Sequence, residues 1–310
     1  MRAQRSRARS ISKPINSPEP SAYFQGVRAF RADPGLDPKW GGHGQARWLL
    51  HGKGTGVLIG ADCVLSAAHI LWREESGEPR RVDRVVVIPA RDGKTKPLGS
   101  VEAADWRTPA GWDPGRQQRR WDFAVIRLKD AIGNKSFKAL GERQLGWWGS
   151  ASLGEGTTLK PLKADWLNGR RVISTGYPGD KCGTRSLVDQ AAIDGCVRHE
   201  PELWASTQWW AEGKVSAVHP ARGLLHHTID THEGQSGSPV WYYWRDEKQG
   251  QSRRWLVGLH VAPGTLQVDA QGNQRRVDNM AVWISSDVLD EIARLRAATG
   301  AVAREAEAGV

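Results

Sequence analysis

The 310-residue sequence lacks any long apolar run. No hydrophobic segment approaches the roughly 20 residues that a membrane-spanning helix needs, so no membrane span is expected. The basic first residues are not followed by an apolar segment, which argues against an ordinary secretory signal peptide. On this ground we expect the chain in this form to be cytoplasmic, with secretion of a processed form as the open alternative. A hydrophobic content of 39% and a mean hydropathy of −0.54 fit a soluble globular protein.

Cysteine is also scarce, with three residues, and no pair has the spacing of zinc ligands. The adjacent His226 and His227 would point to opposite faces of a strand and could not readily bind one metal, so we expect no metal site. The chemistry argued below requires no cofactor either. Cys63 lies in an apolar run and is interpreted as a small buried hydrophobe. Cys182 and Cys196 flank a Gly- and Ser-containing loop and would pair in an oxidising compartment. The sequence leaves that disulfide open.

Acidic residues are outnumbered, 34 against 44 Lys and Arg, giving a formal net charge of +10. Such a field favours acidic partners without identifying them. Part of the excess lies in the first fourteen residues, which contain no acidic residue but include Arg2, Arg5, Arg7, Arg9 and Lys13. We interpret this stretch as a solvated, flexible leader. The alternative is an anionic partner, a nucleic acid or an anionic surface, bound through this Arg-rich arm.

No internal repeat of the solenoid or propeller kind is present. Instead, short apolar segments of about four to eight residues alternate with Gly, Pro, Asp and Asn, a pattern typical of β-strands. The segments are 48–50, 56–59, 64–67, 85–88, 123–128, 172–175, 214–218, 224–229, 239–243, 255–261 and 280–284. A single helix is expected near the C-terminus, where apolar residues recur at helical spacing after N-cap candidates and Gly300 is expected to end it. These features predict an all-β protein built from barrels or sandwiches.

The sharpest local motif surrounds Ser236, in Asp-Thr-His-Glu-Gly-Gln-Ser-Gly-Ser-Pro-Val over 230–240. A serine hydroxyl is a poor nucleophile until a neighbouring base removes its proton. Gly234 and Gly237 would let the chain turn tightly enough to aim backbone N–H groups at a developing oxyanion. An ordinary Gly-Ser turn between strands is the alternative interpretation of this segment alone.

Two further motifs supply the partners that such a serine needs. The strand-like segment before His69 ends in the small residues Ser-Ala-Ala, which would let the histidine pack against backbone while its ring faces a cleft. Asp122 opens the apolar segment Phe-Ala-Val-Ile-Arg-Leu, where a buried carboxylate is costly unless it is paired. Taken alone, the histidine could be an ordinary surface or core residue, and a turn aspartate at the strand edge would be the favoured interpretation of Asp122.

Together the motifs of His69, Asp122 and Ser236, in this order, resemble those of the chymotrypsin-like (trypsin-like) serine peptidases over residues of roughly 45 to 298. The resemblance implies two antiparallel Greek-key β-barrels and a C-terminal α-helix. It implies that Ser236 is the nucleophile, His69 the general base, and Asp122 the residue that fixes the tautomer of His69. The N–H groups of Gly234 and Ser236 would form the oxyanion hole. The implied partner is a protein or peptide substrate.

The expected organisation has four parts. Residues 1–40 would form the basic, flexible arm, and residues 41–155 an N-terminal barrel that carries His69 and Asp122. Residues 156–285 would form a C-terminal barrel with Ser236, and residues 286–310 the helix and a tail. The division between barrels is placed in the Gly-rich region 146–168.

Within the family, the bacterial glutamyl endopeptidase branch is most similar, on Gly-Tyr-Pro-Gly-Asp-Lys at 176–181 and Gly-Gln-Ser-Gly-Ser-Pro-Val at 234–240. Gln235 is uncharged, so the ion pair that activates trypsin-type zymogens should be absent. The branch resemblance implies that Thr231 and His260 bind an acidic side chain, Glu, before the cleaved bond. Both side chains can donate hydrogen bonds to a carboxylate. His260 as an ordinary strand residue is the alternative.

Two departures from the branch bear on specificity. Glu233 stands where the branch usually has Gly, and its charge would repel an acidic substrate. Pro263 follows the recognition strand and lacks the N–H that would pair with an extended peptide. A competing hypothesis is that the chain is a catalytically silent binding or sensor module with a peptidase fold, in which Glu233 blocks the site.

Overall fold

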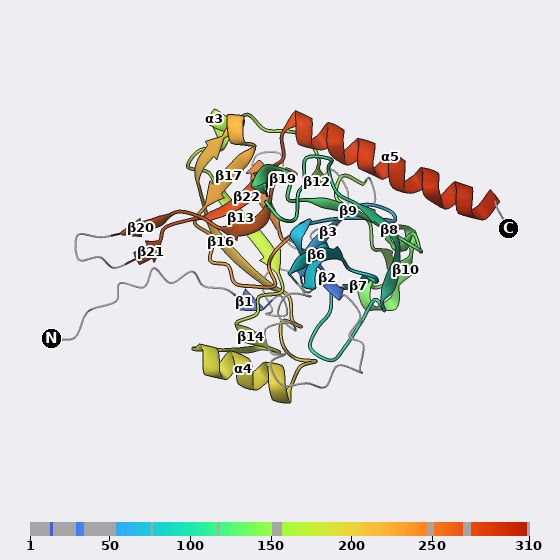
Figure 1. Cartoon of the computed structure of the whole chain (residues 1–310), viewed down its shortest axis with the longest axis horizontal. Coiled ribbons are helices and arrows are strands. Elements are labelled where there is room, and N and C mark those ends of the chain that lie inside the picture. Colours follow the sequence, from blue (N-terminus) through green and yellow to red (C-terminus); the bar gives the residue numbers. More distant parts are fainter. Residues whose placement is uncertain are drawn as a thin grey trace.

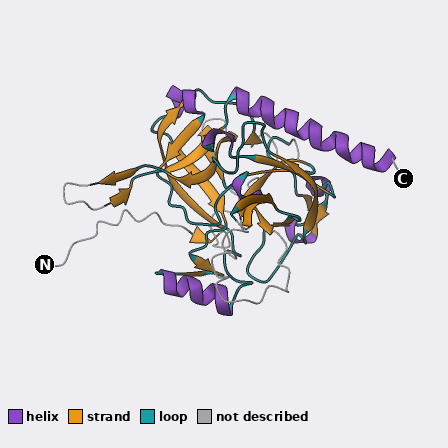
Figure 2. Cartoon of the chain, viewed as in Figure 1, coloured by secondary structure: helices purple, strands orange, loops and turns teal. Residues whose placement is uncertain are grey.

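The computed structural model describes residues 13–14, 29–33, 54–75, 77–116, 118–150, 157–246, 251–268 and 274–308. Within them the chain forms two β-barrel units side by side, with a long C-terminal helix that runs along the first of them (Figures 1 and 2). The all-β expectation is therefore confirmed. Arg2, Arg5, Arg7 and Arg9 of the basic arm and the expected strand at 48–50 lie outside the described residues. In the described part, no helix has the length and apolar character to cross a bilayer.

The first barrel is closed by six antiparallel strands. In hydrogen-bonding order they are β2 (Ala29–Asp33), β3 (Gly54–Gly60), β4 (Cys63–Ser66), β9 (Ala124–Leu128), β8 (Val101–Arg107) and β7 (Val86–Pro89). Strands β3 and β4 are buried along their whole lengths, which explains their unbroken apolar sequences. β2 belongs to this barrel although it lies within residues 1–40, the range expected to be an arm.

The second unit is a sheet that curls back on itself. Its ring of strands is β16 (Trp209–His219), β13 (Arg171–Gly176), β18 (Pro239–Asp246), β19 (Gln251–Pro263), β22 (Asn279–Trp283) and β17 (Leu224–His227). β17 pairs again with β16, which completes the ring. Two short strands extend the sheet: β1 (Lys13–Pro14) pairs with β16 and β12 (Thr157–Thr158) runs parallel to β19.

Four two-stranded ribbons decorate the barrels: β5 (Trp72–Glu75) with β6 (Glu78–Arg81), β10 (Ser136–Phe137) with β11 (Arg143–Gln144), β14 (Lys181–Cys182) with β15 (Arg185–Ser186), and β20 (Leu266–Val268) with β21 (Gln274–Arg276). The β20–β21 ribbon projects away from the second barrel (Figure 1). The short 3₁₀ turns are η1 (His69–Leu71), η2 (Arg119–Trp121), η3 (Ile132–Asn134), η4 (Lys138–Leu140) and η6 (Pro220–Arg222).

Helix α5 (Ser286–Ala308) joins the two barrels by packing on the first after the chain leaves the second. Val288, Ile292 and Leu295 are buried in the same core as strands of the first barrel, at the spacing of one helix face. The expected start of this helix is confirmed. Its expected end at Gly300 is wrong, because the helix continues to Ala308.

The described part of the chain contains two further helices that the sequence pattern does not predict. The short α3 (Ala164–Leu167) precedes β13, and α4 (Gln190–His199) lies in the long connection between β13 and β16 (Figure 1). Asp189 caps α4 by accepting a hydrogen bond from the N–H of Ala192 at 2.8 Å. Ile193 and Val197 bury one face of this helix in a small separate core.

Candidate functional site

His69 is the first residue of η1, and two residues separate it from the end of β4. Antiparallel pairing of β4 with β9 sets Ser66 opposite Ala124, so the chain leaving β4 lies beside the chain that enters β9. The backbone N–H of His69 donates to Asp122 Oδ1 at 3.0 Å. The ring Nδ1 lies 3.0 Å from Oδ1 and 2.9 Å from Oδ2 of the same carboxylate. Strand register thus brings this histidine and aspartate together.

Asp122 lies between η2 and β9, and its side chain is 0% exposed against 26% for His69. A buried carboxylate must be paired, and this one receives three donors. Two come from His69, and the third is Arg119, whose Nη1 donates to Oδ2 at 3.2 Å. The aspartate is predicted from the sequence but the arginine is not, although both lie on one turn, three residues apart.

Ser236 comes from the second unit, in the turn before β18. Its Oγ lies 2.8 Å from His69 Nε2. The turn is held from both sides: the N–H of Thr55 in β3 donates to the Ser236 carbonyl at 2.8 Å, and the N–H of Gly237 donates to the His260 carbonyl at 2.7 Å. Gly237 has a φ of +84°, and a Cβ there would overlap the Thr55 carbonyl. Only glycine allows the turn to approach the first barrel this closely.

The peptide before Gly234 is oriented by a neighbouring loop. The N–H of Gly179 donates to the Glu233 carbonyl at 2.6 Å. Because the C=O and N–H of a trans peptide point in opposite directions, the N–H of Gly234 points away from Gly179. The buried Gln235 braces the same turn, since its Oε1 accepts from the N–H of His232 at 2.7 Å. The uncharged side chain of Gln235 thus stabilises the turn through a hydrogen bond within the turn itself.

The two expected pocket residues have different environments. Thr231 is half-buried in the segment leading to Ser236. His260, in β19, is only 4% exposed, although its backbone N–H donates to the Ser238 carbonyl at 2.9 Å. Its ring Nδ1 lies 3.3 Å from Nε2 of His227. Burial and then the positive charge of His69 lower the pKa of His260 to about 3, so its ring is uncharged at neutral pH.

The adjacent histidines on β17 have different partners. His227 is fully buried against His260, and burial is the main cause that lowers its pKa. His226 instead lies 3.0 Å from Asp278 through its Nδ1. This alternation follows from the strand geometry. The contact of His227 with His260 is not predicted from the sequence. It depends on the pairing of both β17 and β19 with β22.

Negative charge also lies near the expected pocket. Glu233 is exposed, next to Gly234. Asp230 is exposed overall, but desolvation of its carboxyl, followed by the negative charge of Asp180, raises its pKa. Pro263 is the last residue of β19, opposite Asn279 of β22.

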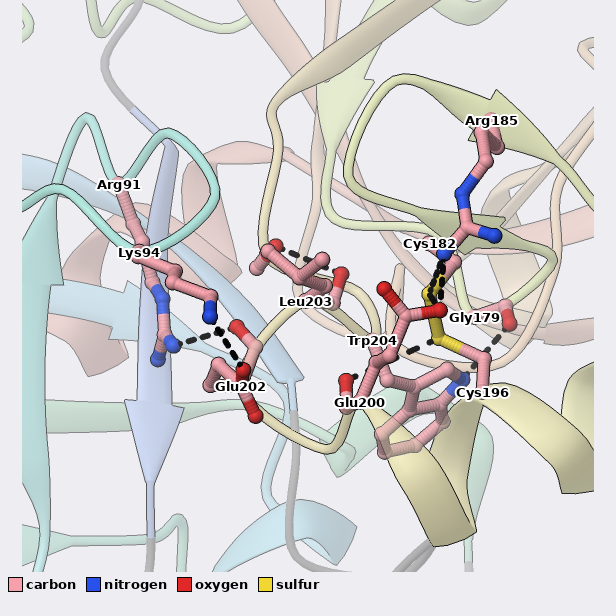
Figure 3. The surroundings of a disulfide bond; sticks show 11 residues. Arg91, Lys94, Gly179, Cys182, Arg185, Cys196, Glu200, Glu202, Leu203 and Trp204 are labelled. Atoms are coloured by element: carbon pink, nitrogen blue, oxygen red, sulfur yellow. Dashed lines mark hydrogen bonds and ion pairs between the residues drawn. A yellow bond between two sulfur atoms is a disulfide. The ribbon is translucent and has the colours of Figure 1, made fainter.

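The loop that holds Glu233 is itself supported by a disulfide (Figure 3). Cys182 and Cys196 are bonded, which resolves the alternative that the sequence left open. Trp204 packs in the same small core, and its Nε1 donates to the Gly179 carbonyl at 2.7 Å. Glu202 of this region receives a buried hydrogen-bond donor from the first barrel, since Arg91 Nη2 lies 2.7 Å from its carbonyl.

Replacing both Cys182 and Cys196 with serine is expected to lower the free energy of unfolding by about 3 kcal/mol, the entropy of closing a loop of this length. The bridge spans 14 residues, in a region with only a small apolar core of its own. Chemical denaturation of the two proteins measures the difference. Reductant should destabilise the wild type and leave the double variant unchanged, and equal stability of both oxidised proteins would contradict the expectation.

The sequence of this chain is similar to those of known peptidases. A model of the trypsin-like peptidase domain matches residues 54–244. The chain is 30% identical over 242 residues to a glutamyl endopeptidase from Bacillus licheniformis, covering 78% of this chain and 58% of that protein. It is 23% identical over 243 residues to an extracellular metalloprotease from Bacillus subtilis, covering 77% of this chain and 56% of that protein. The chain thus spans less than two thirds of both relatives.

A solved structure of a Glu endopeptidase in complex with MPD has the same fold. It superposes with a TM-score of 0.55 at 20% identity, covering 94% of this chain and 98% of that chain. The resemblance to glutamyl endopeptidases found in the sequence is therefore confirmed at the level of family and fold.

Proposed function

This chain belongs to the trypsin-like peptidase family, and from that premise we propose that it is a serine endopeptidase that hydrolyses peptide bonds through an acyl-enzyme. The observation that carries the proposal is the continuous line from Asp122 through His69 to Ser236, with ring-nitrogen distances of 2.9 and 2.8 Å. A single imidazole contacts a buried acid from the first barrel and a hydroxyl from the second. This arrangement activates a serine for acyl transfer.

The chemistry follows from the geometry. Ser236 Oγ attacks the scissile carbonyl while its proton passes to Nε2 of His69, and Asp122 stabilises the imidazolium that forms. The N–H groups of Gly234 and Ser236 receive the developing oxyanion. His69 then returns its proton to the leaving amine, and water, deprotonated by the same imidazole, releases the acyl group and restores Ser236.

We propose in addition that the enzyme prefers Glu before the scissile bond, with Thr231 and His260 as the recognition residues. Thr231 is half-buried, and the His260 backbone is hydrogen-bonded to Ser238, two residues past the nucleophile. The His260 ring already contacts His227 and hydrogen-bonds the backbone of Met280. Recognition of a carboxylate by His260 therefore requires exchange of one of these partners. The relative named a glutamyl endopeptidase and the net charge of +10 support the same preference.

Replacing Thr231 with valine is expected to lower kcat/KM for a Glu substrate by about 10- to 100-fold, the value of one hydrogen bond to a charged group. Valine keeps the shape of threonine and removes only the hydroxyl. The measurement uses peptide p-nitroanilides that differ only in the residue before the scissile bond: Glu, Asp, Gln, Leu or Lys. Cleavage of the Gln and Leu substrates should change little.

Thr265→Val is the matched control, because Thr265 is exposed and its backbone N–H is the group that donates to Asp278. Wild-type preference for Lys over Glu would assign the pocket to Asp230 and overturn the Glu proposal while leaving the hydrolase intact. Labelling of Ser236 by a fluorophosphonate without turnover of any peptide would instead favour the silent binding module, with Glu233 obstructing the site.

A further inference from the structure

The catalytic aspartate has a positively charged neighbour that the triad does not require. Nη1 of Arg119 lies 3.2 Å from Oδ2 of Asp122, the oxygen that also lies 2.9 Å from His69 Nδ1. The arginine side chain is one-third exposed and the carboxylate is fully buried, so the ion pair joins a buried acid to a partly solvated cation. This contact arises from local structure, because side chains three residues apart eclipse on a 3₁₀ turn such as η2.

We propose that Arg119 is a positioning residue of the triad. It fixes the Asp122 carboxylate and competes with His69 for the negative charge of that carboxylate, and so sets the pH below which activity is lost. Arginine stays protonated at every pH at which the protein is folded. The positive charge of Arg119 therefore stays beside Oδ2 of Asp122 throughout catalysis. A cation beside the carboxylate disfavours a second cation on the imidazole, so the ring stays a base to lower pH.

Other charged groups around the triad do not replace this effect. His260 lies close enough for the charges of His69 and Asp122 to act on it, but its pKa of about 3 leaves it neutral over the working range. Arg120, the next residue, points elsewhere: its Nη2 lies 3.2 Å from Asp287 of α5, and its guanidinium lies over the Trp121 ring. Glu233 is exposed, three residues before Ser236 in the sequence.

The two adjacent arginines provide a matched pair of variants. Arg119→Gln keeps an N–H donor for Oδ2 but removes the charge, and Arg119→Lys keeps a charge. Arg120→Gln removes a charge of the same sign from the same turn, at a side chain engaged with Asp287. Arg119→Met provides a second neutral variant, in which neither the charge nor the donor remains.

The first experiment measures kcat/KM against pH for each variant. We expect the midpoint of the acid limb to rise by about 0.5 to 1 pH unit in Arg119→Gln and Arg119→Met. This shift is smaller than the one expected on removal of a charged group that contacts the imidazole directly. Arg119→Lys and Arg120→Gln should keep the wild-type midpoint. A loss of kcat in Arg119→Gln with an unchanged midpoint would show a structural role only and would overturn the proposal, as would an equal shift in Arg120→Gln.

The second experiment needs no turnover, which separates this inference from the proposed function on which it rests. In the Ser236→Ala background, NMR follows the ring signals of His69 against pH, with and without Arg119→Gln. The same upward shift of the titration midpoint supports the proposal even if the natural substrate is never found. Coincident titration curves in two folded proteins would overturn it.

Discussion

Replacing Ser236 with alanine is expected to lower kcat for peptide-bond hydrolysis by about a million-fold. The alanine retains the backbone N–H groups and the contacts of Gly237 with His260, so substrate binding and the turn should survive. What disappears is the hydroxyl 2.8 Å from His69 Nε2, and with it the acyl-enzyme route. The residual rate would come from binding and from the oxyanion donors alone.

Ser238→Ala is the control for this variant. Ser238 lies two residues further along the same turn, and its buried hydroxyl has no hydrogen-bond partner among the described residues. Removal of an unpaired hydroxyl should leave activity close to the wild-type value. Initial rates and fluorophosphonate labelling should separate the two variants: Ser238→Ala keeps both, and Ser236→Ala loses both. Activity of Ser236→Ala above about one part in a thousand of wild type would reject Ser236 as the nucleophile.

The triad residues could be located from the sequence because each follows or precedes a segment whose pattern is local. His69 follows a buried strand and small residues, and Asp122 precedes a buried apolar strand. Glycines flank Ser236, and the structure shows that a side chain at Gly237 would overlap Thr55. Each constraint acts within a few residues of the functional group. Strand pairing then brings the three residues together in space. Their order along the chain is enough to predict that they lie close together.

The residues missing from the sequence analysis owe their positions to contacts between distant segments. His227 meets His260 only because β17 and β19 both pair with β22. Gly179 and Glu233 are hydrogen-bonded although 54 positions (233 − 179) separate them in the sequence. Trp204 supports Gly179 by donating a hydrogen bond to its carbonyl. Helix α4 was overlooked because it is short and contains Gly195, a weak helix former. Its signals were the Asp189 cap and apolar residues at helical spacing.

The position of Arg119 shows a different limit. Its spacing from Asp122 is visible in the sequence, but the chain contains many arginines, and Arg120 is an equal candidate by position. The sequence does not say which guanidinium faces the carboxylate. The 3₁₀ geometry of η2 decides it, because only the residue three positions before the aspartate lies above it on the turn.

Asp122→Asn is expected to lower kcat by about 10⁴-fold, the second large effect. Both carboxylate oxygens have a second donor besides the His69 ring: Oδ1 accepts the His69 N–H at 3.0 Å, and Oδ2 accepts Arg119 at 3.2 Å. The NH₂ group of asparagine must therefore face one of these donors in either orientation. The side chain no longer holds the ring tautomer with its proton on Nδ1, so Nε2 loses its ability to accept the proton of Ser236.

The same clash predicts a stability cost, which distinguishes Asp122 from an aspartate at the surface. A buried donor facing a donor costs about 1 to 3 kcal/mol, so the variant should unfold at lower denaturant concentration. Asp130→Asn is the control, since Asp130 is exposed and forms an ion pair at 3.4 Å with the exposed Lys135; it should change neither rate nor stability. Steady-state kinetics and urea unfolding of both variants provide the measurement. The two effects in Asp122→Asn have one origin, which is the set of donors around a buried carboxylate. A variant with full stability and full activity would therefore show that this carboxylate neither is buried nor holds the imidazole.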